Sequence, residues 1–355
     1  MEGLVSGGGR WRAIALAGMC AGLVGGCGSS DDGQRVDTVP ALGFVERFAP
    51  VVHLHPDERY RPLSVPELVE RARFMWSHGV GRGRETIAAG VRRRGARDGA
   101  RVLRLRTIGS DDGHVQVAQP REGCAECGQT TYSTASRTRP FTGMAPRLRD
   151  GEGFYLDLPD GWTGPDGRRG GPVYTEVVEE ESGRRVDLRV TYWLLFAANA
   201  PAGAPSEHHQ GDWERVSVLL RRVDGGARYR PLSVRYYQYD GGVDVPWAEA
   251  PVVDAGPGEG ASHPEAFLSK GDHTPYPGPV SGTRALTSDG ESVPLQQEAT
   301  TCDRCPRLST WRSLVNADTQ PWYGFGGAWG AIGSDEASTG PGGPSAWPSE
   351  PDVRG

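Results

Sequence analysis

The chain has 355 residues, which is enough for one large or two modest domains. Hydrophobic residues make up only 37%, yet 10 Trp, 11 Tyr and 8 Phe supply bulky core material. The formal net charge of −6 gives no indication of a nucleic-acid partner, and we expect none. With 52 Gly and 28 Pro, short elements joined by turns are expected, which favours a β architecture over a helical bundle.

The N-terminus carries a positive segment followed by an apolar one. Arg10 and Arg12 precede residues 13–26, which are too short to span a bilayer comfortably. This segment ends in Leu-Val-Gly-Gly-Cys, which resembles a bacterial lipobox. The resemblance implies a signal peptide over residues 1–26, a lipid on Cys27, export, and anchoring of the protein to the bacterial cell membrane. An ordinary secretory signal with an incidental cysteine is the alternative.

Four cysteines follow the signal as two Cys-x-x-Cys pairs, Cys124 with Cys127 and Cys302 with Cys305. Paired units of this kind are typical of a tetrahedral zinc site. Exported proteins, however, meet oxidising conditions that favour disulfides. We expect disulfides, with structural zinc as the alternative and a redox pair as a third interpretation.

The first folded segment follows a polar stretch over residues 27–40, which predicts a flexible tether. A single domain is expected over 41–355. It begins with a short strand and a turn near 51–60. Ser64 and Glu67 then form a capping-box pattern, which predicts a helix that continues through Trp76.

The remaining chain is dominated by strand signals. Apolar and β-branched residues alternate over four segments in its middle, 173–178, 186–196, 215–220 and 232–239. Further strands are expected at 154–156 and 263–270. The spacing predicts an antiparallel β-sandwich with one or two short helices. Loop-rich insertions are expected near 110–171 and 278–310.

The stretch His-His-Gln-Gly-Asp-Trp-Glu, which leads into one of these strands, is the strongest candidate for a site. Residues two apart on a strand share a face, so Asp212 and Glu214 lie on the core face with Val216, while Trp213 points the other way. Carboxylates there need solvent, a proton or a cation. With His209 they suit calcium, magnesium or manganese. A solvated strand end is the alternative.

Other polar residues are candidates for the same neighbourhood. His273 ends another predicted strand at a Gly-flanked turn, so it is the best distant partner, with a structural turn histidine as the alternative. His55, Asp57 and Glu58 follow the first strand and are expected to cap a turn, with a role in the site as the alternative. The sequence holds no nucleophile-elbow, zinc-protease or nucleotide-binding signature.

Several short motifs occur in a fixed order along the chain, at 48–58, 172–174, 192–199, 211–214, 271–277 and 329–344. In this order they resemble the vacuolar protein sorting-associated protein 62 family, here in a bacterial lipoprotein form. The matches are scattered over residues 45–347. The resemblance implies a fold and a site more than a defined activity.

The stretch around Asp212 also resembles the heptapeptide G-H-R-H-D-W-E of the necrosis-inducing cytolysins of plant pathogens. In those proteins the first His, the Asp and the Glu surround a divalent cation, which implies His209, Asp212 and Glu214 here. An acidic ligand expected upstream has no counterpart, and Asn199 or Glu207 is its substitute. Three positions depart from the pattern, namely His208, Gln210 and Gly211.

Three functions remain open from the sequence. The favoured one is a surface-anchored module whose cation binds a polar ligand such as a glycan or a lipid headgroup. The second is a metal-dependent hydrolase of an envelope phosphodiester or glycan. The third is a structural envelope protein with no ligand. The sequence does not define the oligomeric state.

Overall fold

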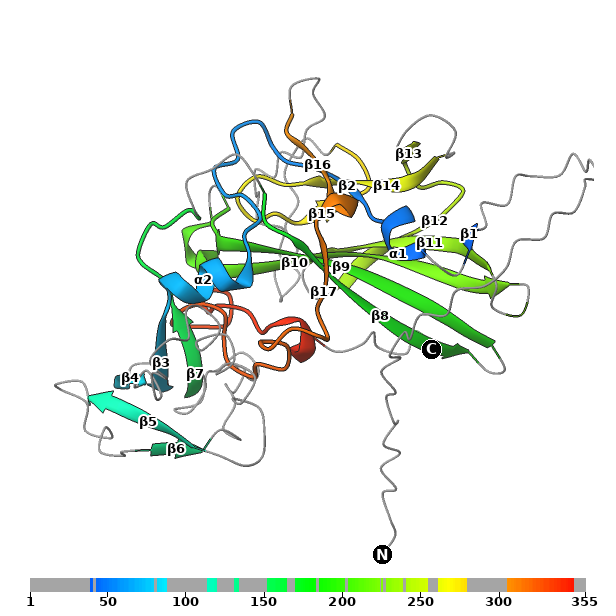
Figure 1. Ribbon diagram of the computed structural model, residues 1–355. Helices are drawn as coiled ribbons and strands as arrows, with labels where there is room; N and C mark the ends of the chain where they lie inside the picture. The colour runs from blue at the N-terminus through cyan, green and yellow to red at the C-terminus, as the bar shows by residue number, and fades with distance from the viewer. Residues whose placement is uncertain are drawn as a thin grey trace, which may run out of the picture.

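The described residues form three β-sheets and two short α-helices in the computed structural model (Figure 1). The fold is therefore mainly β, as predicted from the sequence. The structure describes residues 39–40, 43–79, 82–87, 114–119, 131–133, 152–164, 170–182, 185–201, 204–223, 225, 228–238, 241–254, 261–279 and 305–347.

The largest sheet has seven described strands in the order β1-β11-β10-β9-β8-β17, with β12 also beside β11. Its members are β1 (Val39–Pro40), β8 (Val173–Ser182), β9 (Arg185–Asn199), β10 (His209–Val223), β11 (Arg228–Gln238), β12 (Gly241–Pro246) and β17 (Leu314–Asn316). The four strands predicted in the middle of the chain are confirmed as β8 to β11. They pair antiparallel as successive neighbours.

The second sheet has the order β13-β14-β2-β16, with β15 beside β14, and lies above the largest sheet in Figure 1. Its strands are β2 (Val51–His53), β13 (Val252–Asp254), β14 (Ala261–Leu268), β15 (Pro275–Tyr276) and β16 (Arg307–Ser309). The Tyr236 hydroxyl on β11 donates to the Glu265 carbonyl at 2.9 Å, which ties the two sheets together. The sandwich is not purely antiparallel, because β14 pairs parallel with β2 and β17 pairs parallel with β8.

Strand β10 presents two buried faces, and this explains its run of apolar residues. Val216 and Val218 are fully buried on the face that carries Tyr192 of β9, and the Tyr192 hydroxyl donates to the Val45 carbonyl. On the opposite face Trp213 packs against Trp193, with 6.3 Å between the ring centroids. The C-terminal segment covers this second face with buried aromatic rings from Trp322, Phe325 and Trp329.

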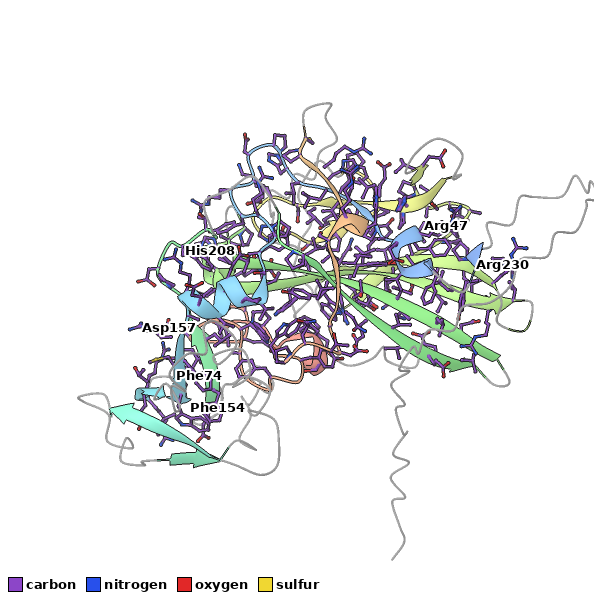
Figure 2. The ribbon with its side chains drawn as sticks, viewed as in Figure 1. Arg47, Phe74, Phe154, Asp157, His208 and Arg230 are labelled. Atoms are coloured by element: carbon purple, nitrogen blue, oxygen red, sulfur yellow. The ribbon has the colours of Figure 1, made fainter. Side chains whose placement is uncertain are left out.

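The third sheet, of order β6-β5-β4-β3-β7, lies to one side of the sandwich (Figure 1). Its strands are β3 (Arg73–His78), β4 (Arg84–Ile87), β5 (His114–Gln119), β6 (Thr131–Ser133) and β7 (Glu152–Asp157). Phe74 of β3 and Phe154 of β7 stack at 5.4 Å, and Phe74 also contacts Phe325 of the C-terminal segment (Figure 2). The short helices outside the sheets are α1 (Phe44–Arg47), α2 (Val65–Arg71), η1 (Pro205–Glu207), η3 (Thr310–Arg312) and η4 (Pro344–Ala346).

The predicted helix begins where expected but ends early. The capping box forms, because the Ser64 hydroxyl accepts from the Glu67 amide and the Glu67 carboxylate accepts from the Ser64 amide. The prediction that the helix continues through Trp76 is wrong, since Ala72 is extended and β3 follows. Aromatic residues pack well on a pleated sheet, and pairing of β3 with β4 and β7 outweighs local helix propensity.

Two other boundaries also differ from the predictions. Val39 and Pro40, which the prediction placed in the tether over 27–40, pair with Tyr229 and Arg228 of β11. The insertions contain strands: β7, within 110–171, agrees with the strand expected at 154–156, whereas β5 and β6 in the same insertion and β16 within 278–310 were not predicted. Short strands that pair with distant partners have too little alternation to be recognised in the sequence.

Gly211 is required where β10 begins. Its φ is +68°, and a Cβ there would lie 1.7 Å from the Trp329 carbonyl oxygen, whereas Gly225 has a φ of +66° with no atom within 4 Å. We therefore expect Gly211→Ala to lower the free energy of unfolding by more than about 3 kcal/mol, and Gly225→Ala by only about 1 kcal/mol from backbone strain. Urea denaturation of both variants measures this, and equal losses would contradict the close approach.

Candidate functional site

Three segments meet where β10 begins, at the end of the sandwich marked by His208 in Figure 2. They are the loop after β2 (residues 54–60), the first residues of β10, and the turn at 269–274 that joins β14 to β15. A backbone hydrogen bond from Ala200 to the Gly271 carbonyl, at 2.7 Å, holds the end of β9 to this turn. The turn therefore brings its polar residues against β10.

His273 lies at the centre of this junction and is fully buried. Its Nδ1 is 2.7 Å from Asp212 Oδ2, and its Nε2 is 3.6 Å from Glu58 Oε2. The imidazole stacks on the Phe196 ring at 3.8 Å with an interplanar angle of 1°, and the Tyr60 ring contacts it edge-on at 5.7 Å. One histidine thus connects all three segments.

The two carboxylates keep His273 protonated. Burial alone would lower the pKa of His273, but the bonds and charges of Asp212 and Glu58 outweigh burial and raise that pKa to about 9. Burial likewise opposes ionisation of Glu58, yet its interaction with His273 and two backbone amides lowers the pKa of Glu58 to about 2. Asp212, His273 and Glu58 are therefore a carboxylate–imidazolium–carboxylate ion triplet at neutral pH.

The backbone around the triplet is fixed by further hydrogen bonds. Glu58 Oε2 accepts from the Gly271 amide at 2.7 Å, and Oε1 accepts from the Tyr60 amide at 2.8 Å. His273 has a φ of +52°, the one positive φ among the described non-glycine residues. Such a conformation is uncommon, so the contacts of the imidazole must hold the turn in place.

Negative charge exceeds positive charge around β10. Glu214 is half-buried beside Asp212 on the same strand face, and Asp272 adds a third buried carboxyl. Burial first, and then the charges of Asp212 and Asp272, raise the pKa of Glu214 well above its usual value. Burial also raises the pKa of Asp272, although the hydroxyls of Ser269 and Thr274 donate to its two oxygens. Within the described residues, Glu214 has no hydrogen-bond partner.

His209 is neutral and already paired in this structure. Burial lowers its pKa. Its Nδ1 is 2.8 Å from the Gly211 carbonyl, so Nδ1 carries the proton, and the Asn199 amide donates to Nε2 at 3.0 Å. Asn199 lies directly opposite His209 in the β9–β10 register, and its Oδ1 is buried without a partner. A cation at Nε2 would require Asn199 to move.

The predicted site residues therefore come together in two groups. Asp212 and Glu214 share the buried face with His273 above them, as predicted from strand period and turn position. His209 and Asn199 pair with each other at the rim. In the part of the chain that the structure describes, no three His, Cys, Asp or Glu side chains form a group ready to hold a metal ion.

Two important residues were missed by sequence reasoning. Glu58 was expected to cap a turn, with a role in the site only as the alternative, and Asp272 was not singled out. Glu58 lies 213 residues from Gly271 in sequence, so no local pattern indicates their contact. The remaining turn prediction holds for His55, whose Nδ1 accepts from the Asp57 amide at 3.1 Å.

Of the predicted lipid and cysteine sites, four residues lie outside the described part of the chain, namely Cys27, Cys124, Cys127 and Cys302. Cys305 is buried. The pairing of the four cysteines stays a prediction. Among the described helices, none is long and apolar enough to cross a membrane.

Comparison with known proteins finds no match: no family model, no curated protein and no solved structure resembles the chain at a significant level.

The triplet predicts a loss of stability at alkaline pH. A histidine whose pKa rises from 6.5 in the unfolded chain to about 9 in the folded one stabilises the fold fully below pH 6.5. That contribution, on the order of 3 kcal/mol, is lost as the pH rises through 9. Urea denaturation between pH 6 and 10 measures the loss.

The matched variants are His273→Gln and His208→Gln. We expect His273→Gln to be less stable at pH 6.5 and to show a flatter alkaline decline, because the titrating imidazole is gone. His208 is exposed, so His208→Gln should keep the wild-type decline. The same decline in all three proteins would show that His273 is not protonated in the folded state.

Proposed function

We propose that the protein is a membrane-anchored binding module that holds a divalent cation at Asp212 and Glu214 and, through it, a polar ligand such as a glycan or a lipid headgroup. One observation carries this proposal: Glu214 is a half-buried carboxyl group with no hydrogen bond to any described residue, placed on one strand face with Asp212 and near Asp272. Carboxylates so arranged repel one another unless a cation or a proton lies between them.

Two carboxylates fit a metal site with free coordination positions better than a site that protein atoms fill completely. Magnesium and manganese are commonly held by one or two carboxylates while water or ligand oxygens complete the shell. Asp212 uses Oδ2 for His273, which orients the carboxylate, and its other oxygen has no hydrogen bond to a described residue. Ligating carboxylates that are themselves hydrogen-bonded are typical of metal sites. The same arrangement leaves coordination positions for a ligand.

His273 does not favour the hydrolase alternative. A general base must reach a substrate and must be able to accept a proton. His273 is fully buried and protonated at neutral pH, so it does neither in this conformation. We therefore assign it the role of orienting Asp212. His209 can coordinate the cation through Nε2 only if the Asn199 amide no longer donates a hydrogen bond to that nitrogen.

The anchor is proposed from the lipobox alone. A lipid on Cys27 would place the sandwich at the surface of the bacterial cell membrane, and the resemblance to the vacuolar protein sorting-associated protein 62 family stays a proposal. Neither the lipid anchor nor the family resemblance depends on the proposed cation or its ligand. Mass spectrometry of the protein made in a bacterial host would show the diacylglycerol thioether on the N-terminal Cys27, and an unmodified Cys27 would contradict it.

Cation binding is tested by thermal unfolding and calorimetric titration with magnesium, manganese and calcium after treatment with a chelator. A cation at 100 times its dissociation constant should stabilise the fold by about 2.7 kcal/mol. Glu214→Gln should weaken binding more than tenfold, because one of two protein ligands is lost. No binding of any of the three cations would refute the proposal.

The control is Glu249→Gln, which removes an exposed carboxylate in the β12–β13 loop. It should bind the cation as the wild type does. Asp212→Asn is less informative, since it also removes the partner of His273. If Glu249→Gln weakens binding as much as Glu214→Gln, the effect is one of net charge and not of ligation.

A further inference from the structure

A second buried histidine, His53, lies in the second sheet of the sandwich and takes no part in the ion triplet. It is on β2, and the strand register places Phe267 of β14 on one side of it and Arg307 of β16 on the other. The imidazole stacks on the Phe267 ring at 4.3 Å with an interplanar angle of 11°. The three side chains share one face of the sheet, opposite to the face on which Val52 packs into the core.

His53 has one carboxylate partner, which it shares with a second cation. Its Nε2 is 2.9 Å from Glu265 Oε1, and Arg307 Nη2 is 3.8 Å from the same oxygen. An ionised carboxylate can only accept, so Nε2 of His53 carries a proton and donates it. The side chain of His53 is 8% exposed, that of Glu265 19% and that of Arg307 57%. The imidazole is therefore the least hydrated of the three, and Arg307 already balances part of the carboxylate charge.

A proton on His53 is disfavoured in this closed arrangement. Burial is the largest influence on the pKa of His53 and lowers it, whereas the hydrogen bond and charge of Glu265 raise it. The charge of Arg307 lowers the pKa further, so the net pKa lies below the ordinary value of 6.5. His273 shows the opposite result, because two carboxylates act on that imidazole without a competing cation.

The titratable and charged groups on this face can be taken strand by strand. On β14 they are His263 and Glu265, on β16 the group is Arg307, and on β15 it is Tyr276. Of these groups, Glu265 and Arg307 act on the pKa of His53. The protonation of His53 is therefore decided by burial and by one carboxylate and one guanidinium on the two neighbouring strands.

Strand β16 is the part of this sheet that opens most easily. It has three residues, lies at the edge of the sheet and, among the described strands, pairs with β2 alone. Two hydrogen bonds attach its ends: the Leu54 amide donates to the Pro306 carbonyl at 3.0 Å, and the Thr310 hydroxyl donates to the Pro50 carbonyl at 2.6 Å. Short edge elements open at a lower free-energy cost than central strands. Opening hydrates the His53 ring, so a proton on that ring favours the open form.

We propose that His53, Glu265 and Arg307 form an acid-sensitive latch, in which a proton that binds to Nδ1 of His53 releases β16 from β2. Above pH 6.5 the imidazole is neutral and the latch is closed. The stability that neutral His53 gives to the closed sheet is lost as the pH falls from 6.5 through the lowered pKa. Leu54 begins the loop that carries Glu58, so release of β16 also removes one attachment of that loop. The latch does not depend on the proposed cation.

The test is hydrogen–deuterium exchange of the purified full chain at pH 7.5 and pH 5, with the protection of each amide corrected for its intrinsic exchange rate at that pH. We expect the protection of the amides of Leu54 and residues 307–309 to fall about threefold or more at pH 5, while amides in β9 and β10 stay protected. His53→Gln keeps a hydrogen-bond donor but does not titrate, so these amides should be equally protected at both pH values.

Arg307→Gln removes the cation beside His53, so acid should reduce protection less than in the wild type. The matched control is Arg312→Gln, which removes an exposed arginine of η3 just after β16 and should keep the wild-type response. If His53→Gln does not fold, the imidazole signals of His53 in NMR spectra measure its protonation directly, and we expect a midpoint below pH 6.5. Equal protection of the wild type at both pH values, the wild-type loss in His53→Gln or Arg307→Gln, or a midpoint at or above pH 6.5 would each overturn the proposal.

Discussion

The buried ion triplet of Asp212, His273 and Glu58 is the interaction on which the site depends. It joins the start of β10 to the turn after β14 and to the loop after β2, three segments far apart in sequence. An unpaired buried charge costs several kcal/mol, so each member requires the other two. The rigid end of the sandwich follows from this requirement, and so does the fixed position of the Asp212 carboxylate.

Strand β10 gives the molecule two chemically different surfaces. Because side chains alternate along a strand, Asp212 and Glu214 face the second sheet while Trp213 and Arg215 face the C-terminal segment. One face gathers carboxylates around a single imidazolium, and the other gathers aromatic rings around a guanidinium.

The sequence predicted the features that depend on local pattern. Alternation located β8 to β11, and period-two spacing put Asp212 and Glu214 on one face with Trp213 on the other. The capping box located the first residue of α2 but not its last, because pairing of Phe74 and Trp76 in β3 decides where the helix ends. Glu58 was expected first to cap a turn and only as an alternative to be in the site, since its contact with His273 depends on how two distant loops fold together. His209 was predicted to converge with Asp212, but its local partners Gly211 and Asn199 hold both of its nitrogens.

The most direct test of the central claim is a crystal structure of the protein grown with manganese, with data collected at a wavelength where manganese scatters anomalously. We expect one anomalous peak within about 2.5 Å of carboxylate oxygens of both Asp212 and Glu214, with His273 still bonded to Asp212. Absence of a peak there at saturating manganese, with Glu214 hydrogen-bonded to protein or protonated, would contradict a cation site and leave the acidic face with a purely structural role.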